Sequence, residues 1–267
     1  MGDMITLLTD FGLSDPYVAS MKGVILSINP NAKIIDISHL VPRHDVFYGA
    51  LLLWSTYKYF PKSTIHVVVV DPGVGTKRKA IIIKSKNYYF VGPDNGVLTL
   101  AAFDDCIEEV FVIKKDSRFI ADRVSHTFHG RDIFAPIAAY LSNGVKVEEL
   151  GLKIDVDDIV RIKMPEYRVL DNKVLGEVIY IDNFGNLVTS ISSDIVDDGL
   201  LKYGVKYKIR IKGKVITAPL VKAYGEVGKD MPLIIPDSFG LIEISINLGS
   251  AKERLGVSVK DKVEIYL

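Results

Sequence analysis

The segment VVVVDPGVGTKRKAIII, residues 67–83, places Asp71 and Arg78 in one glycine-rich connection between two runs of β-branched residues. A connection between strands needs only the glycines, whose backbone freedom permits tight turns and close approach to another group. A carboxylate and a guanidinium in the same connection can form an ion pair, bind a ligand or take part in a reaction. The segment is therefore the first candidate for a functional site.

Three further loops carry polar side chains where an apolar segment ends or a helix begins. They are LLTDFG with Asp10, VGPDNGVLT with Asp94 and Asn95, and SHTFHGRDIFAP with His126, His129, Arg131 and Asp132. In open α/β sheets, ligands bind outside the carboxyl ends of the strands. Several loops with polar side chains in one half of the chain therefore indicate a binding site, although they do not identify a reaction.

Each of these residues also has a structural interpretation. An aspartate after a strand is often a helix N-cap or turn residue, and PDNG is an ordinary turn sequence, so Asp94 is expected to be structural. Arg131 and Asp132 are expected to form an ion pair at a helix start. A single histidine usually has a structural role and forms local hydrogen bonds. We expect this role for His39, His44 and His66.

The first half of the chain alternates short apolar segments with longer amphipathic ones, which predicts an α/β domain with a mostly parallel sheet. Strands are expected at residues 4–10, 32–38, 64–71 and 80–85, with a strand and turn in 88–99 leading into a helix. Helices are expected at residues 16–29, 46–60 and 130–144, the last stopped by Gly144.

After Asp155 the sequence consists of short β-branched segments separated by Gly, Asn and Asp turns. Clear examples are residues 206–213, 241–247 and 261–267. This pattern predicts a smaller all-β, barrel-like domain. The boundary is expected within residues 155–168, near Pro165, which gives an α/β domain at 1–160 and a β domain at 161–267.

Composition narrows the function. Lysine plus arginine and aspartate plus glutamate are both 33 among 267 residues, so no net charge favours nucleic acid or an anionic membrane. Cys106 is the only cysteine, which excludes an intramolecular disulfide and a multi-cysteine metal site. Because no signal-peptide core and no apolar run of about 18 residues is present, we expect a cytoplasmic protein without a membrane segment.

Known cofactor motifs do not match. The first strand is followed by DFGLSDP instead of a dinucleotide-binding glycine motif, and GVGTKRK lacks the ending of a phosphate-binding P-loop. There is no HExxH-type helix motif with paired histidines and no set of cysteines for a metal. From the residues alone we expect a small-molecule site that uses Asp, Arg and His, without a metal and without a cofactor.

Five segments in this order, TDFGLSDPYV, DPGVGTKRKAI, VGPDNGVLT, TFHGRDIFAP and IDNFGNLVTSI, together resemble the S-adenosyl-L-methionine (SAM) hydrolases that form adenosine. These enzymes are also called SAM hydroxide adenosyltransferases and are related to fluorinases and chlorinases. The resemblance covers nearly the whole chain. It implies attack of water or hydroxide on ribose C5′ of SAM, with methionine leaving and adenosine as the other product.

The resemblance also implies roles for individual residues. The catalytic set falls on Asp71, Arg78 and His129, and Asp10 corresponds to the aspartate that accepts both ribose hydroxyls. Further substrate contacts correspond to Asp182, Asn186, Tyr224, Ser238 and Asn247. The family builds its site between neighbouring subunits, so the resemblance implies a homotrimer, with SAM and adenosine as small-molecule partners.

Departures from the halogenating relatives favour a hydrolase. Those enzymes have Tyr at the position of Asp71, a hydroxyl residue at Val74 and Tyr-Ser at His129-Gly130, so a charged, water-holding set replaces their halide site. Phe239 stands where the fluorinase has an arginine for the substrate carboxylate, which leaves recognition of the methionine end open. The alternatives are a non-catalytic adenosine- or SAM-binding protein, a metal-dependent nucleotide hydrolase and, less favoured, a SAM-dependent halogenase.

Overall fold

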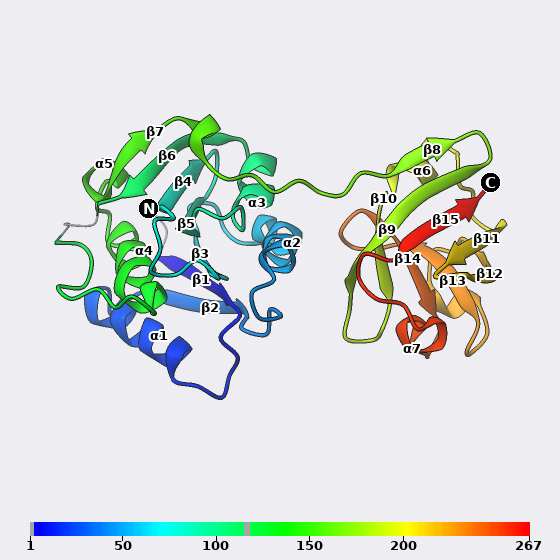
Figure 1. The fold of residues 1–267 in the computed structure, drawn as a ribbon, viewed down its shortest axis with the longest axis horizontal. Coiled ribbons are helices and arrows are strands. Elements are labelled where there is room, and N and C mark those ends of the chain that lie inside the picture. Colours follow the sequence, from blue (N-terminus) through cyan, green and yellow to red (C-terminus); the bar gives the residue numbers. More distant parts are fainter. Residues whose placement is uncertain (1–2, 115–117) are drawn as a thin grey trace. The chain divides into compact units, whose positions relative to one another are not determined.

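The computed structural model describes residues 3–114 and 118–267, and the chain divides into two compact units, Met1–Lys163 and Met164–Leu267 (Figure 1). Each unit has its own core of buried aliphatic and aromatic side chains. Within the described ranges, no helix is both long enough and apolar enough to cross a membrane.

Unit 1 is built on a seven-stranded sheet in the order β2-β1-β3-β5-β4-β6-β7. Its strands are β1 (Met4–Thr9), β2 (Lys33–Ser38), β3 (Ile65–Val69), β4 (Ala80–Ser85), β5 (Tyr89–Pro93), β6 (Ile107–Ile113) and β7 (Gly151–Ile154). The strands predicted in the first half are therefore present, within a few residues of the expected bounds.

The prediction of a mostly parallel sheet was wrong, because the sheet is mixed. Strand β1 is parallel to β2 and β3, and β3 is parallel to β5, whereas β4 pairs antiparallel with β5 and β6, and β6 with β7. Only residues 86–88 connect β4 to β5. A connection this short can join only antiparallel neighbours, since a parallel crossover needs a dozen or more residues.

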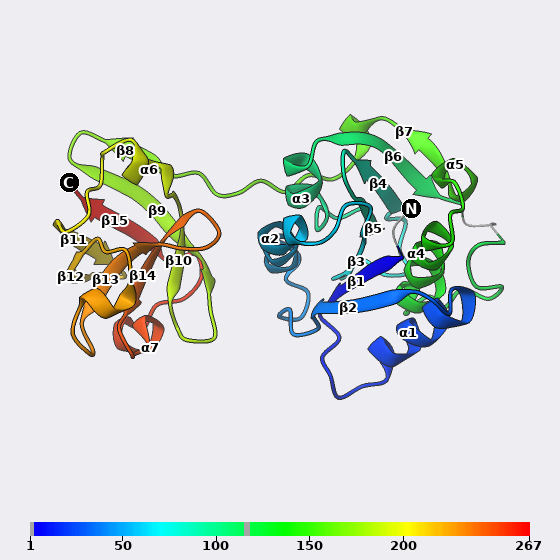
Figure 2. The ribbon, with the colours of Figure 1, turned by 180° about the vertical axis from the view of Figure 1, so that it is seen from behind.

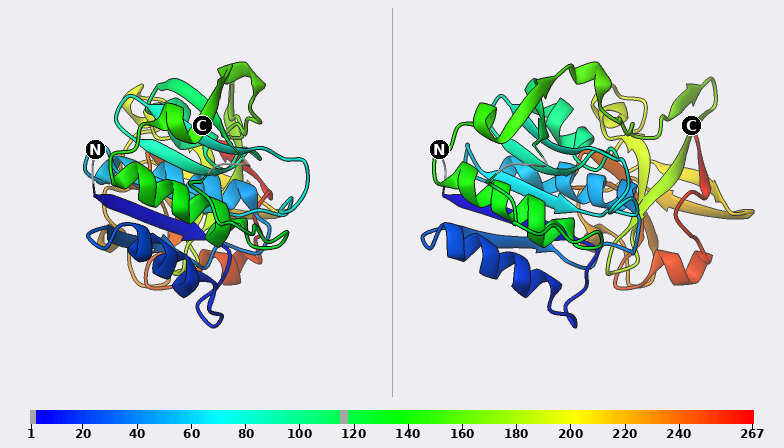
Figure 3. Two further views of the ribbon diagram at one scale, coloured as in Figure 1. Left: turned by 90° about the vertical axis from the view of Figure 1, so that its left-hand side faces the viewer. Right: turned by 60° about the vertical axis from the view of Figure 1, so that its left-hand side comes forward.

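Helices cover both faces of this sheet. They are α1 (Tyr17–Ile28), α2 (Val46–Thr56), α3 (Thr99–Asp104), α4 (Ala135–Ser142) and α5 (Val147–Leu150), with short turns η1 (Tyr57–Tyr59), η2 (Gly130–Phe134) and η3 (Val156–Asp158). Successive strand residues point to opposite faces, so Leu7 joins the core under α1 and α4, and Leu8 the core under α2 and α3. Figure 3 shows α1 and α4 on one face of the sheet.

Local signals fix the helix ends. Asp45 caps α2, because its carboxylate accepts the Tyr48 N–H at 2.9 Å. The helix predicted at residues 130–144 begins as the π-helical turn η2 and continues as α4. It ends as expected before Gly144, whose φ of 85° lies in the left-handed region that favours glycine.

Unit 2 is the predicted all-β, barrel-like domain (Figure 2). Its strands are β8 (Arg168–Leu170), β9 (Lys173–Ile181), β10 (Leu187–Ser192), β11 (Lys206–Ile211), β12 (Lys214–Pro219), β13 (Pro232–Pro236), β14 (Leu241–Ile246) and β15 (Lys262–Tyr266). The pairs along the order β12-β11-β15-β9-β10-β14-β13 are antiparallel, and a Leu220–Ile234 bridge nearly closes the sheet. The unit also contains α6 (Asp194–Asp197), α7 (Ala251–Leu255) and η4 (Tyr224–Glu226).

His66, on β3, is fully buried among aromatic rings, and its Nδ1 lies 2.8 Å from the Thr6 hydroxyl. Burial lowers the pKa of His66 from 6.5 to about 3, so the folded protein keeps this ring neutral at pH values where the unfolded chain protonates it. Protonation of the unfolded state therefore destabilises the fold as the pH falls below 6.5.

We predict that the free energy of unfolding falls by up to about 2 kcal/mol through His66 between pH 7 and pH 5, at about 1.4 kcal/mol per pH unit below its unfolded pKa. Urea unfolding of the wild type and of His66→Gln across this range measures the effect. The variant should lose much less stability between the two pH values, whatever its stability at pH 7. Parallel pH dependence in both proteins would contradict the assignment.

Candidate active site

The carboxyl ends of two neighbouring strands bring the first two predicted aspartates to one edge of the sheet. Strands β1 and β3 are parallel, with Thr9 opposite Val69. Asp10 directly follows β1, and Asp71 follows β3 after the buried Val70. Both carboxylates line one cavity of about 320 Å³ in unit 1, together with His129.

Asp71 and Arg78 form a buried ion pair across their connection. Arg78 Nε donates to the two carboxylate oxygens of Asp71 at 2.9 and 3.0 Å, and Arg78 Nη2 donates to Oδ2 as well. The side chains of Asp71 and Arg78 are only 5% and 10% exposed. Little water screens the pair, and its fork-like geometry fixes the guanidinium plane. The ring of Phe134 lies beneath the guanidinium, 5.4 Å from Cζ.

His129 completes the array. Its Nδ1 lies 2.7 Å from Arg78 Nη2. Because a guanidinium can only donate, Nδ1 must be the acceptor, and the proton of the neutral imidazole lies on Nε2. The carboxylate, guanidinium and imidazole therefore carry no net charge together, and Arg78 links the other two groups.

Two loops hold the connection that bears Asp71 and Arg78. At its ends, Asn95 Nδ2 donates to the Val70 carbonyl at 2.8 Å, and the Asp94 N–H donates to the Lys79 carbonyl at 3.0 Å. The turn PDNG is thus hydrogen-bonded to both ends of the β3–β4 connection. Asp94 is structural, as predicted: it is buried, its Oδ1 accepts the Val160 N–H at 2.9 Å, and burial raises its pKa.

The second loop meets the connection at Gly75. The φ of Gly75 is +76°, and a Cβ on it would lie 2.3 Å from the His126 carbonyl oxygen. Only glycine permits this approach, which brings residues 126–129 against the turn. His129 then directly precedes η2, where the predicted ion pair joins Arg131 Nε to Asp132 Oδ1 at 2.6 Å. π-Helical turns of this kind are frequent at functional sites.

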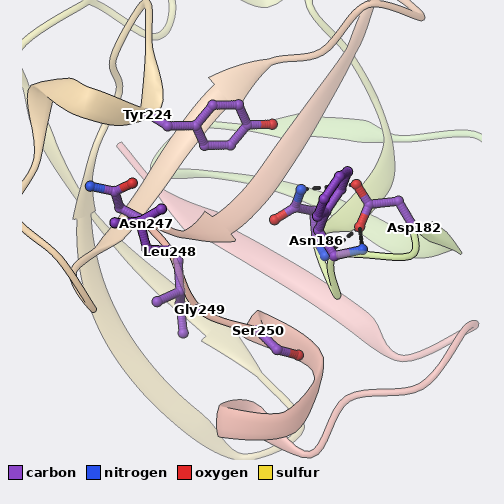
Figure 4. A pocket seen from close by; sticks show the side chains of 9 residues that line it. Asp182, Asn186, Tyr224, Asn247, Leu248, Gly249 and Ser250 are labelled. Carbon is purple, nitrogen blue, oxygen red and sulfur yellow. Dashed lines mark hydrogen bonds between the residues drawn. The ribbon is translucent and has the colours of Figure 1, made fainter.

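Unit 2 holds a second cavity, of about 620 Å³, lined by four of the predicted residues (Figure 4). They are Asp182, Asn186, Tyr224 and Asn247. Asp182 organises the β9–β10 turn: its Oδ1 accepts the N–H groups of Phe184 and Asn186 at 2.9 and 2.8 Å, and its Oδ2 accepts Asn186 Nδ2 at 2.9 Å. Asp182 is therefore both a turn residue and a cavity residue.

The other predicted residues of unit 2 differ in their surroundings. Tyr224 donates its hydroxyl to Glu243 Oε1 at 2.7 Å, and Asn247 Nδ2 donates to the Val227 carbonyl at 2.8 Å. Ser238 lies in the exposed turn between β13 and β14 and is not among the described residues that line this cavity. Its neighbour Phe239 packs against Tyr180, with ring centroids 6.3 Å apart.

Comparison with known proteins decides the family. The family described as "SAM hydroxide adenosyltransferase N-terminal domain" matches residues 5–151, and the corresponding C-terminal domain matches residues 176–264. This chain belongs to the SAM hydroxide adenosyltransferase family. The resemblance found in the sequence motifs is thereby confirmed.

Individual relatives agree with this assignment. A Methanocaldococcus jannaschii protein named (R)-S-adenosyl-L-methionine hydrolase is 40% identical, over 98% of this chain and 95% of its own length. A fluorinase of Nocardia brasiliensis is 27% identical, over 97% of each chain. The crystal structure of an uncharacterized conserved protein from Thermotoga maritima has a TM-score of 0.93 and 42% identity, covering 98% of this chain and 99% of that one.

Part of the wall of the unit 1 cavity is formed by residues that the sequence analysis did not predict for the site. Arg43 and His44 line it, although His44 was interpreted as an ordinary polar residue. The backbone of His44 is in the left-handed region, with φ 67°, and its N–H donates to Asp10 Oδ2 at 2.9 Å. The aromatic residues Tyr17 and Phe128, whose rings are 5.1 Å apart, were missed as well. A non-glycine residue at positive φ is the kind of backbone feature that no sequence pattern displays.

Among the described residues, no group of three or more His, Cys, Asp or Glu side chains is arranged to hold a metal ion. His66 and His39 each form one expected hydrogen bond, from Nδ1 to the hydroxyls of Thr6 and Thr9 at 2.8 and 2.9 Å. The buried Nε2 of His66 has no partner among the described residues, so the expectation is met on one side of this ring only.

We predict that Gly75→Ala destabilises this protein by more than about 2 kcal/mol, because the new Cβ meets the His126 carbonyl and alanine is strained at positive φ. Gly73→Ala is the matched control in the same turn. A Cβ on Gly73 would find its nearest atoms at 3.5 Å, so this variant should change stability by less than about 1 kcal/mol. Denaturant unfolding measures both variants, and equal stability of the two would refute the proposed packing of Gly75.

Proposed function

We propose that this protein hydrolyses SAM to adenosine and L-methionine, and that Asp71, Arg78 and His129 prepare the water that attacks ribose C5′. The single observation that carries the catalytic assignment is the buried array of these side chains, in which Arg78 links Asp71 to His129 and the latter two line one cavity with Asp10. The names of the full-length relatives support the reaction, and fluorinases are more distant from this chain than hydrolases are.

The proposed reaction is a direct displacement. The water oxygen forms a bond to C5′ while the C5′–S bond breaks, and the sulfonium sulfur takes the bonding electron pair and becomes a neutral thioether. One proton is released from the attacking water. No acid is needed at the leaving group, and no cofactor takes part, because SAM itself is the substrate.

The array supplies positioning and charge. Bulk water has a pKa near 15.7 and is a poor nucleophile, so a fixed guanidinium that favours hydroxide helps the attack. Arg78 serves this role because it cannot lose its proton. His129, fixed through Nδ1, orients the water. Asp71 holds the guanidinium plane and balances its charge beside a cationic substrate. Alignment with the C5′–S bond contributes several kcal/mol.

Substrate contacts are proposed for the remaining predicted residues. Asp10 accepts the two ribose hydroxyls, for which a carboxylate that already accepts one N–H still has lone pairs. The contacts in unit 2 are assigned to Asp182, Asn186, Tyr224, Ser238 and Asn247. Because Asn247 Nδ2 bonds to the Val227 carbonyl, its backbone rather than its side chain is proposed to contact substrate.

The negative charge of the Asp71 carboxylate favours a hydrolase over a halogenase. Halide is an anion, and the carboxylate of Asp71 beside the cavity disfavours it, whereas a water molecule can both donate to and accept from this array. The relatives are named for the (R) sulfonium epimer, and we propose the same preference here.

We also propose a homotrimer with sites between neighbouring subunits, as the family resemblance implies. Light scattering on the purified protein should give the mass of three chains. A monomer that hydrolyses SAM at full rate would contradict this part of the proposal.

We predict that Arg78→Ala and His129→Ala each lower kcat for adenosine formation from SAM by about 100-fold or more, the scale of loss when a group acting on charge in the transition state is removed. Adenosine binding should persist, because neither residue is assigned to the nucleoside. Arg161→Ala is the control, since it removes an exposed Arg–Asp pair elsewhere in unit 1. Chromatography measures turnover and calorimetry measures binding. Full activity of Arg78→Ala would overturn the catalytic assignment.

A second prediction tests the site of attack. In H₂¹⁸O with excess chloride, one ¹⁸O should enter the 5′-hydroxyl of adenosine and none should enter methionine, because the new bond is O–C5′. No 5′-chloro-5′-deoxyadenosine should form. Mass spectrometry reads both outcomes, and label in methionine or a chlorinated nucleoside would exclude the proposed reaction.

A further inference from the structure

A buried carboxylate lies behind the cavity of unit 2 and outside the proposed substrate contacts. Glu243 is in the middle of β14, only 5% exposed. Its Oε1 accepts two hydroxyl groups, from Tyr224 at 2.7 Å and from Ser245 at 2.6 Å. Glutamate is seldom buried without a partner, so the two hydroxyls account for its stability in the core. These bonds do not by themselves explain how Glu243 affects ligand binding in the cavity.

The bond to Glu243 determines how Tyr224 meets a ligand. A tyrosine hydroxyl has one proton to donate and lone pairs to accept. Because the proton is directed to Glu243, the hydroxyl can offer a ligand in the cavity only its acceptor side. Figure 4 shows the Tyr224 hydroxyl pointing toward the side of the cavity formed by Asp182 and Asn186.

We infer that Glu243 is a positioning residue, which fixes the Tyr224 hydroxyl as a hydrogen-bond acceptor for a donor group of the substrate. The inference rests on the proposed function and names the chemistry that this part of the cavity selects: a nucleoside-type ligand bearing an N–H donor or a cationic ammonium group. SAM carries both. Glu243 contacts Tyr224 and not the reacting atoms, so it acts on binding rather than on the displacement.

The electrostatic surroundings agree with a preference for donors and cations. Burial raises the pKa of Glu243, and the carboxylates of Asp182 and Asp237 raise it further. Burial also raises the pKa of Tyr224, with the bond to Glu243 adding to the effect, so the phenol keeps its proton. Several carboxylates near one cavity favour a positively charged ligand over a neutral one.

A purely structural role for Glu243 predicts different behaviour. In that case replacement would change stability, and its effect on substrate binding would not depend on the Tyr224 hydroxyl. A double-mutant cycle between Tyr224→Phe and Glu243→Leu separates the two roles, because residues that act through one interaction are not additive. Glu243→Gln is the conservative variant, since its Oε1 can still accept the phenol proton.

We expect Tyr224→Phe and Glu243→Leu each to raise KM for SAM about tenfold with kcat within about twofold, and the double variant to be no worse than either. Glu243→Gln should restore KM to within about threefold of the wild type. Tyr266→Phe is the matched control: it removes a tyrosine–glutamate bond of 2.6 Å to Glu264 in the same unit, away from this cavity, and should leave KM unchanged.

The inference would be overturned if the KM increases of the two single variants multiplied in the double variant. A wild-type KM in Glu243→Leu would overturn it as well. Thermal unfolding of every variant identifies losses that come from misfolding. If the wild type formed no adenosine, the proposed function would fail by itself. The same cycle would then be read from dissociation constants of SAM and adenosine measured by calorimetry, where additive effects would refute the role of Glu243.

Discussion

The candidate site in unit 1 depends on the buried ion pair between Asp71 and Arg78. Two charges removed from water are stable only when each has close partners. Here the carboxylate accepts hydrogen bonds from Nε and Nη2 along one edge of the guanidinium, and the same Nη2 also donates to the imidazole of His129. Removing any member leaves a buried charge or an unpaired donor, so the three side chains stabilise one another in a single arrangement.

That arrangement explains features of the backbone that look unrelated in the sequence. The connection between β3 and β4 has to cross the end of β5, because β5 lies between those strands in the sheet. The turn after β5 bonds to both ends of the connection, and Gly75 permits contact with the loop before His129. Motifs far apart in the sequence thus belong to one hydrogen-bonded assembly.

The sequence predicted the strand positions and part of the candidate site. It did not predict features that depend on residues distant in the sequence but adjacent in the fold. Strand positions and the convergence of Asp10 with Asp71 followed from apolar runs and the edge rule for α/β sheets. Strand direction did not, since an apolar run such as that of β4 reads the same in a parallel or antiparallel sheet. His44 was missed because its contribution is a backbone N–H at positive φ. Glu243 was missed because a polar residue in an apolar strand does not reveal its partner.

The fastening of the β3–β4 connection at both ends has a consequence for how new activities arise in such a scaffold. The loop ends are held by main-chain carbonyls of Val70 and Lys79, which are present whatever side chains these positions carry. Side chains inside the loop can therefore be exchanged without loss of these end contacts, provided that Gly75 is kept and that Asp71 and Arg78 are replaced together. A change in which nucleophile is used then requires few substitutions, and the protein's evolutionary history need not include a new fold.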